Sequence, residues 1–349
     1  MSKKFMKKSF LLFAALALLS LPLQTQAATW KAPTPEGYTQ ITWAKANGIT
    51  TFMKAPEGSG HIDFLTFIYL PYNQIKLIAS STPKLDWGAG KAPFETDTSV
   101  HNWSFAKTGA EKTKQATPTA QFVWNVPFFN YTIPMSDLSL GLKSTESTST
   151  YITSGSRPEN DVAQSRKMLL IDNKTNTAEI SDFDEARFVS YGDQAVEGFA
   201  ATETWKGTDT DVARLFVGVR PGGKELVVYC SQGASPNEAI AALNAAGVPT
   251  ENQLQADGGS SATCGYNMAG QYFVEPGRTL THLMGAFPFI ARGTVTTDNL
   301  NVRKGPGTTF AAVRKLKKGT VVTAVEEKNG WYRISETQEW ITKQYFKAQ

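Results

Sequence analysis

Cysteine and histidine are scarce in this sequence. The only cysteines are Cys230 and Cys264, and the three histidines, His61, His101 and His282, are scattered. No Cys-x-x-Cys pair or histidine cluster is present, so we predict no metal site, although a need for a divalent metal stays open. In an oxidising compartment the two cysteines are expected to form a disulfide worth roughly 3–4 kcal/mol.

Two common catalytic signatures are also missing. The chain has no Gly-x-Ser-x-Gly elbow, which argues against a serine hydrolase, and no Gly-x-x-x-x-Gly-Lys-Ser/Thr loop, which argues against an NTPase. It also lacks a motif of interleaved aromatic and basic residues, so nucleic acid is not an expected partner.

Long apolar runs are absent apart from one at the N-terminus. Residues Phe10–Leu23 are almost wholly apolar, follow four lysines and precede the small-residue site Thr25–Ala27. The run is too short for a spanning helix, which needs about 20 residues, but is typical of a signal peptide. We therefore expect a signal peptide over residues 1–27, an exported mature chain starting near Ala28 (periplasm, cell wall or outside the cell), and no membrane span after processing.

Charge is unevenly distributed along the mature chain. The formal net charge of +4 equals the charge of the four N-terminal lysines. Residues Arg292–Gln349 hold eleven basic and five acidic residues, which leaves the preceding domain acidic. A basic module of this kind favours an anionic partner such as a cell-wall polymer.

Short β-type runs separated by turn residues make up the last sixty residues. In the run Leu300–Arg303, alternation puts Leu300 and Val302 on one face, and Asn329-Gly330 indicates a two-residue hairpin. The stretch "LNVRKGPGTTFAAVRKLKKGTVVTAVEEKNGWYRI", ending in "EWITKQYF", resembles the bacterial SH3 domain. The resemblance implies a small all-β barrel over 291–349 that tethers an exported protein to peptidoglycan or another cell-envelope glycan. Glu339 replaces the family's usual glycine.

A strand–helix–strand unit is predicted near the end of the preceding domain. The apolar run Glu225–Cys230 is followed by Ser235 and Glu238, a capping box, and Gly247 is the expected C-terminal cap of the helix. A crossover of this kind predicts two parallel, nearby strands, with a ligand loop beyond their carboxyl ends. We therefore expect an α+β domain with a mixed α/β sheet over 28–290.

That loop is Asp257-Gly258-Gly259-Ser260-Ser261. Two glycines let backbone amides approach a ligand, and the serines add hydroxyl donors. Taken alone, the string is also common in ordinary turns.

Four segments of this domain together resemble the phosphodiester glycosidase family. They are listed in family order: Asn125–Asn130, Ala195–Phe199, Arg214–Val219, and Asp257–Ser261 with Arg278 downstream. Ser260 stands where the family often has a third glycine, and Leu215 where it usually has threonine.

The resemblance implies hydrolysis of a sugar-1-phosphodiester. Such a reaction needs a carboxylate near the anomeric carbon and cations on the phosphate. Asp257 is the candidate carboxylate, and Arg214 and Arg278 are the candidate cations. Candidate substrate-binding residues are Asn125, Gly258, Gly259, Ser260, Ser261 and Glu197. A second carboxylate would be Glu197 or Asp193, and no cofactor is implied. The alternative is a non-catalytic wall- or polysaccharide-binding protein with the same fold.

Overall fold

The computed structural model describes residues 30–58, 60–79, 120–126, 142–143, 165–203, 212–266, 271–274, 282–335 and 338–348. Strands dominate this part of the chain, and its two α-helices are α4 (Glu185–Ser190) and α5 (Pro236–Ala245). The expected signal peptide lies outside the described residues. Within them, no helix combines the length and the apolar character that crossing a membrane requires.

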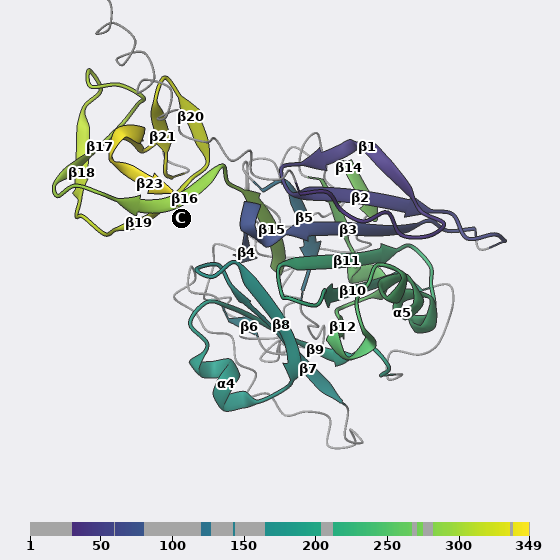
Figure 1. Cartoon of the computed structure of the whole chain (residues 1–349). Coiled ribbons are helices and arrows are strands. Elements are labelled where there is room, and N and C mark those ends of the chain that lie inside the picture. The colour runs from purple at the N-terminus through teal and green to yellow at the C-terminus, as the bar shows by residue number, and fades with distance from the viewer. Residues whose placement is uncertain are drawn as a thin grey trace, which may run out of the picture. The chain divides into compact units, whose positions relative to one another are not determined.

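A ten-stranded sheet forms one layer of the main domain (Figure 1). Its strands are rich in β-branched and aromatic residues, which favour a pleated, packed surface. In spatial order the strands are β1 (Thr39–Ala46), β2 (Ile49–Lys54), β3 (Asp63–Tyr69), β11 (Glu225–Ser231), β10 (Arg214–Val219), β12 (Gln253–Gln255), β9 (Gln194–Ala200), β7 (Arg166–Asp172) and β8 (Thr177–Asp182), and β6 (Leu142–Lys143) pairs with β9.

A five-stranded sheet forms the second layer. In spatial order it contains β14 (Gln271–Val274), β13 (Cys264–Tyr266), β5 (Phe122–Asn125), β15 (His282–Pro288) and β4 (Asn73–Ala79). One core joins the layers: Val217, Val228 and Leu254 of the large sheet belong to the same buried cluster as Trp124 and Met284 of the small one. Each such side chain contributes roughly 1.5–3 kcal/mol through burial. The main domain is therefore a β-sandwich.

The predicted mixed α/β domain is thus wrong. Every strand pair found among the described residues is antiparallel, including all those of β10, β11 and β12. The local crossover itself exists, because β11 and β12 are each antiparallel to β10, which lies between them, and so run parallel to each other. The prediction took one strand–helix–strand unit as typical of the whole domain. The rest of the sheet is built by antiparallel pairing of strands that are distant in the chain.

Helix α5 has the predicted caps. The Ser235 hydroxyl accepts from the Glu238 backbone N–H at 3.2 Å, and the Glu238 carboxylate accepts from the Ser235 backbone N–H at 2.7 Å. Gly247 follows the helix at φ +80°, a conformation that favours glycine. The helix packs on β10 and β11 and covers part of the large sheet's outer face (Figure 1).

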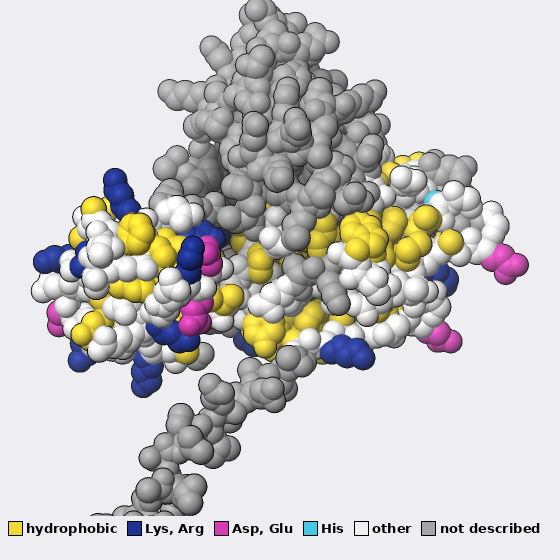
Figure 2. Space-filling model, turned by 90° about the horizontal axis from the view of Figure 1, so that it is seen from above, with side chains coloured by type: hydrophobic (Ala, Val, Ile, Leu, Met, Phe, Trp, Pro, Cys, Tyr) yellow, Lys and Arg dark blue, Asp and Glu magenta, His cyan; other side chains and the backbone are white. Residues whose placement is uncertain are grey.

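The C-terminal strands form the predicted barrel. One of its sheets has the order β19 (Val321–Ala324), β16 (Ala291–Val295) and β23 (Phe346–Ala348), and the other β18 (Ala312–Leu316), β17 (Leu300–Arg303), β22 (Trp340–Thr342), β21 (Trp331–Arg333) and β20 (Glu326–Lys328). Leu300 and Val302 are buried as predicted, and Asn329 and Gly330 have φ of 53° and 78° in the β20–β21 turn. Lys and Arg side chains are spread over the barrel surface, at the left in Figure 2.

Candidate active site

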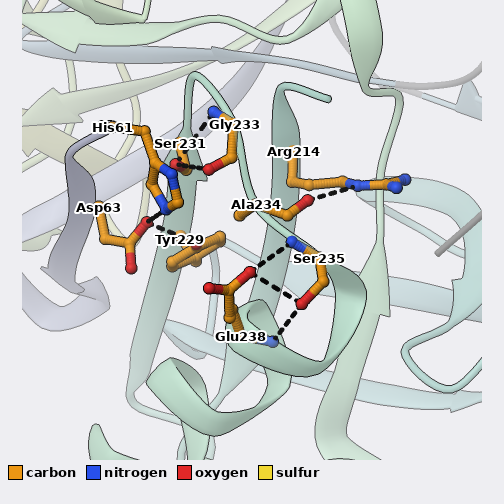
Figure 3. Close-up of polar contacts among 9 residues, drawn as sticks. All are labelled: His61, Asp63, Arg214, Tyr229, Ser231, Gly233, Ala234, Ser235 and Glu238. Atoms are coloured by element: carbon orange, nitrogen blue, oxygen red, sulfur yellow. Dashed lines mark hydrogen bonds and ion pairs between the residues drawn. The ribbon is translucent and has the colours of Figure 1, made fainter. Parts of the chain in front are cut away.

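Arg214 is the first residue of β10 and is only 1% exposed. Its Nε–H donates to the backbone carbonyl of Ala234, at 3.0 Å, in the loop between β11 and α5 (Figure 3). Burying a guanidinium costs several kcal/mol unless its charge and N–H groups are compensated. The role of Arg214 as a cation that binds the phosphate stays a prediction.

Asp257 lies opposite Arg214 in the backbone register, on the segment that follows β12. Beyond β12 the backbone continues beside β10, because the Ala256 N–H donates to the Leu215 carbonyl at 3.0 Å and the Gly259 N–H to the Ala213 carbonyl at 2.7 Å. The β10–β12 register, extended over these bonds, sets Asp257 opposite Arg214. Asp257 is 3% exposed, so both of these candidate site residues are buried.

The two glycines of the loop are required for different reasons. A Cβ on Gly258 would lie 2.8 Å from the Ala213 carbonyl oxygen, too close for any side chain. Gly259 has φ +60° and begins the 3-10 turn Gly259–Ser261. The departure at Ser260 falls inside this turn, whose backbone accommodates residues other than glycine.

Asn125, at the end of β5, ties the loop to the small sheet. Its Nδ2 donates to the Asp257 carbonyl at 3.0 Å, and its Oδ1 accepts from the Thr263 N–H at 2.8 Å. Both ends of the amide thus hold the loop. This contact set indicates loop positioning, and the substrate-binding role of Asn125 stays a prediction. Ser261, at the end of the turn, is fully buried.

The predicted disulfide between Cys230 and Cys264 is present, with Cα atoms 6.5 Å apart. Cys230 lies on β11 of the large sheet and Cys264 on β13 of the small one. The bond therefore crosses the sandwich core, and its second cysteine lies directly after the Asp257 loop.

The two candidates for a second carboxylate occupy different surroundings. Asp193 accepts hydrogen bonds from the Asn173 N–H (2.7 Å), the Asn173 amide (3.2 Å) and the Gln194 amide (3.0 Å), a structural turn network. Glu197 is 2% exposed and forms an ion pair with Arg166. The β9–β12 register, extended by two residues, brings Glu197 opposite Asp257. Of the two, Glu197 is therefore the one beside the candidate site.

Several residues at this end of the sheet were missed from the sequence. Arg166 pairs with Glu197, and its guanidinium also lies 4.3 Å above the Phe183 ring. Asp63 and Tyr229 form a second buried polar group on the other side of Arg214. Nothing local marks these residues, since their partners are distant in the chain.

Some residues expected at the site are not among those that the structure describes. Arg278 and the segment 127–130 lie outside them, so the role of Arg278 stays a prediction. Among the described residues no group of three or more His, Cys, Asp or Glu side chains is arranged to hold a metal.

Comparison with known proteins identifies the C-terminal region. The model of the bacterial SH3 domain matches residues 298–347. These residues are a bacterial SH3 domain. In the SH3 domain a groove of about 440 Å³ is lined by residues that include Asp298, Asn301, Trp331 and Tyr345. Paired aromatic and polar groups of this kind suit a glycan or a peptide.

A comparison with curated protein sequences finds no match, while solved structures of distant sequence are similar to most of the chain. One similar structure is the catalytic domain of zebrafish N-acetylglucosamine-1-phosphodiester alpha-N-acetylglucosaminidase, auto-inhibited by its pro-peptide. It is 14% identical, with a TM-score of 0.45, over 74% of this chain and 87% of that one. Another is a putative exported protein of Burkholderia pseudomallei, 11% identical, with a TM-score of 0.36, over 68% of this chain and 74% of that one. Both TM-scores lie below 0.5, so the function is argued from the residues of this chain.

Proposed function

We propose that this protein is an exported glycosidase that hydrolyses a sugar-1-phosphodiester of the N-acetylglucosamine-1-phosphate type, or a related cell-envelope glycan. The observation that carries the proposal is that Arg214 and Asp257 are both buried and lie opposite each other in the register of adjacent segments, next to a loop that needs both its glycines. A buried cation and a buried carboxylate on adjacent segments are the two kinds of group that such a reaction requires.

Arg214 would bind the phosphate. A guanidinium matches two phosphate oxygens at once and keeps its charge at any physiological pH. The departing phosphomonoester is a weak base, so charge on the phosphate matters more than protonation of the leaving oxygen. Arg278 is proposed as a second cation on the same group.

Asp257 would act at the anomeric carbon. The bond from this carbon to the phosphate oxygen breaks, its electron pair leaves with the phosphate, and positive charge develops on the sugar. Asp257 stabilises that charge, as nucleophile, base or electrostatic partner, and the oxygen of water ends on the anomeric carbon. We propose Glu197 as the second carboxylate because it lies in register with Asp257.

The SH3 domain would hold the enzyme on the cell wall. Its basic surface suits anionic wall polymers, and the groove with Trp331 and Tyr345 offers aromatic faces to peptidoglycan. Export is supported by the N-terminal lysines with their apolar run and by a disulfide, which persists in oxidising compartments.

The direct test is incubation with a synthetic N-acetylglucosamine-1-phosphodiester and measurement of free reducing sugar. We expect sugar release by the wild-type protein and none by Asp257→Asn. Absence of release, together with binding to purified wall, would instead support the non-catalytic wall-binding protein.

A further inference from the structure

A second buried polar cluster adjoins Arg214 and has no part in the proposed reaction. The Tyr229 hydroxyl donates to Asp63 Oδ1 at 2.7 Å, and His61 Nε2 lies 3.5 Å from the same oxygen (Figure 3). Asp63 is 4% exposed, and Tyr229 and Ser231 are fully buried. In the sheet register Ser231 lies between Asp63 on one side and Arg214 on the other.

Maintaining this cluster is costly. Burial raises the pKa of the Asp63 carboxyl, against the opposing effect of the hydrogen bond from Tyr229. Burial also raises the pKa of the Tyr229 hydroxyl. Apolar side chains would fill the same space without this cost, so the polar groups call for a purpose other than stability.

The cluster is connected to Arg214 through the loop between β11 and α5. The Ser231 hydroxyl donates to the Gly233 carbonyl and accepts from the Gly233 N–H, both at 3.3 Å, which fixes the start of the loop. The capping box of Ser235 and Glu238 fixes its end. Between these anchors lies Ala234, whose carbonyl accepts the Arg214 Nε–H.

One hydrogen bond of this kind orients the whole cation. The guanidinium is planar, so fixing the direction of Nε–H also fixes the plane in which the two Nη groups lie. In Figure 3 the guanidinium points away from Tyr229 and Asp63, with the Ser231–Ser235 loop between them. The cluster and the anion-binding edge of Arg214 are thus on opposite sides of one short loop.

We propose that the His61–Asp63–Tyr229–Ser231 cluster positions Arg214: it holds the loop whose Ala234 carbonyl sets the guanidinium plane, and thereby determines the affinity for the substrate's phosphate. These are positioning residues, since they reach the substrate only through Arg214. The inference rests on the proposed function for the identity of the anion.

The test measures binding of inorganic phosphate to the full chain by calorimetry. We expect Tyr229→Phe and Ser231→Ala each to weaken binding about fivefold, the typical effect of one hydrogen bond. The matched control is Tyr266→Phe, which removes another buried hydroxyl, bonded to Thr51 in the sandwich core, and should leave phosphate affinity unchanged. Thermal unfolding of both tyrosine variants separates loss of stability from loss of affinity.

A double-mutant cycle decides whether the effect passes through Arg214. Arg214→Lys keeps the charge but lacks the Nε–H, so adding Tyr229→Phe to it should weaken phosphate binding no further. Equal weakening in both backgrounds would overturn the inference, as would wild-type affinity in Tyr229→Phe and Ser231→Ala. Should Ser231→Ala fail to fold, Tyr229→Phe decides.

The phosphate-binding test of the positioning role does not require that the protein turn over a substrate. Phosphate binding that follows the expected pattern, without release of sugar, would reject the proposed function and keep the positioning role. Absence of phosphate binding by the wild-type protein would overturn the positioning role itself.

Discussion

The SH3 domain and the β-sandwich differ in the burial of their charged side chains. In the SH3 domain, the ion pairs Arg314–Glu339, Arg333–Glu326 and Lys343–Glu327 are partly exposed. In the sandwich, Asp63, Arg214, Asp257 and Glu197 are each at most 4% exposed. Exposed pairs contribute at most about 1 kcal/mol and cost little, whereas buried charges cost several kcal/mol. These four buried charged residues are therefore where we propose that the chemistry takes place.

The largest effect on activity should come from substitutions of the buried charged residues. Asp257→Asn should lower kcat about 10³-fold while KM changes little, because the positive charge at the anomeric carbon exists only in the transition state. Arg214→Ala should lower kcat and raise KM, since the phosphate is charged both in the bound substrate and in the transition state. The control is Asp193→Asn, a buried carboxylate held in a turn network, with near wild-type kinetics. Equal losses in Asp193→Asn and Asp257→Asn would assign Asp257 to folding.

The disulfide across the sandwich core should give the next largest effect. Replacing Cys230 and Cys264 by alanine should lower the free energy of unfolding by about 3–4 kcal/mol, because an unfolded chain with this 34-residue cross-link has less conformational freedom. Urea unfolding measures the change. Reductant should destabilise the wild-type protein and leave the double variant unaffected; an equally stable double variant would contradict the prediction.

In the SH3 domain the expected effect is on binding alone. Trp331→Ala should weaken sedimentation with purified cell wall about tenfold, since an aromatic side chain in a groove often dominates binding energy. Turnover of a soluble substrate should stay unchanged. Trp43→Ala, at an exposed tryptophan of β1, is the control. Unchanged wall binding in Trp331→Ala would move the binding site away from this groove.

The smallest effect is expected at Glu339, the departure from the SH3 pattern. Arg314 donates two hydrogen bonds to its carboxylate, at 3.0 and 2.7 Å, and lowers its pKa. A lowered pKa in the folded state means that the stabilisation is present above the carboxyl's ordinary pKa and is lost as pH falls through the lowered value. Glu339→Gln should therefore cost less than about 1 kcal/mol at pH 7, and the cost should disappear once the pH has fallen below the lowered pKa.

Hydrogen exchange of the amides of β18 and β22 measures this local stability. Glu327→Gln, in a pair exposed on both sides, serves as the control and should have a smaller effect. A cost that persists unchanged to low pH would show that packing, and not the ion pair, is responsible.

Local features of both regions could be predicted from the sequence. The alternation of Leu300 and Val302, the turn at Asn329-Gly330 and the capping box of α5 each depend on residues within a few positions of one another. The disulfide followed from the number of cysteines.

Pairing between distant segments could not be predicted. β3 pairs with β11 across more than 150 residues, and the Tyr229–Asp63 hydrogen bond spans 166. The sequence predicted that the parallel strands β11 and β12 lie close together in a mixed sheet. In the structure β10 lies between them and is antiparallel to both, as in the rest of the sheet. The alignment of Arg214, Asp257 and Glu197 depends on the pairing of β12 with β10 and β9. The sequence pointed to the Asp257 loop through the crossover, and to Arg214 and Glu197 only through a family resemblance.

The most direct test of the account is hydrolysis of a sugar-1-phosphodiester in oxygen-18 water, with mass analysis of both products. Cleavage at the anomeric carbon, with Asp257 beside it and Arg214 on the phosphate, puts the label on the anomeric oxygen of the sugar. Label on the phosphate would mean attack at phosphorus, and would contradict the glycosidase even if the protein were fully active.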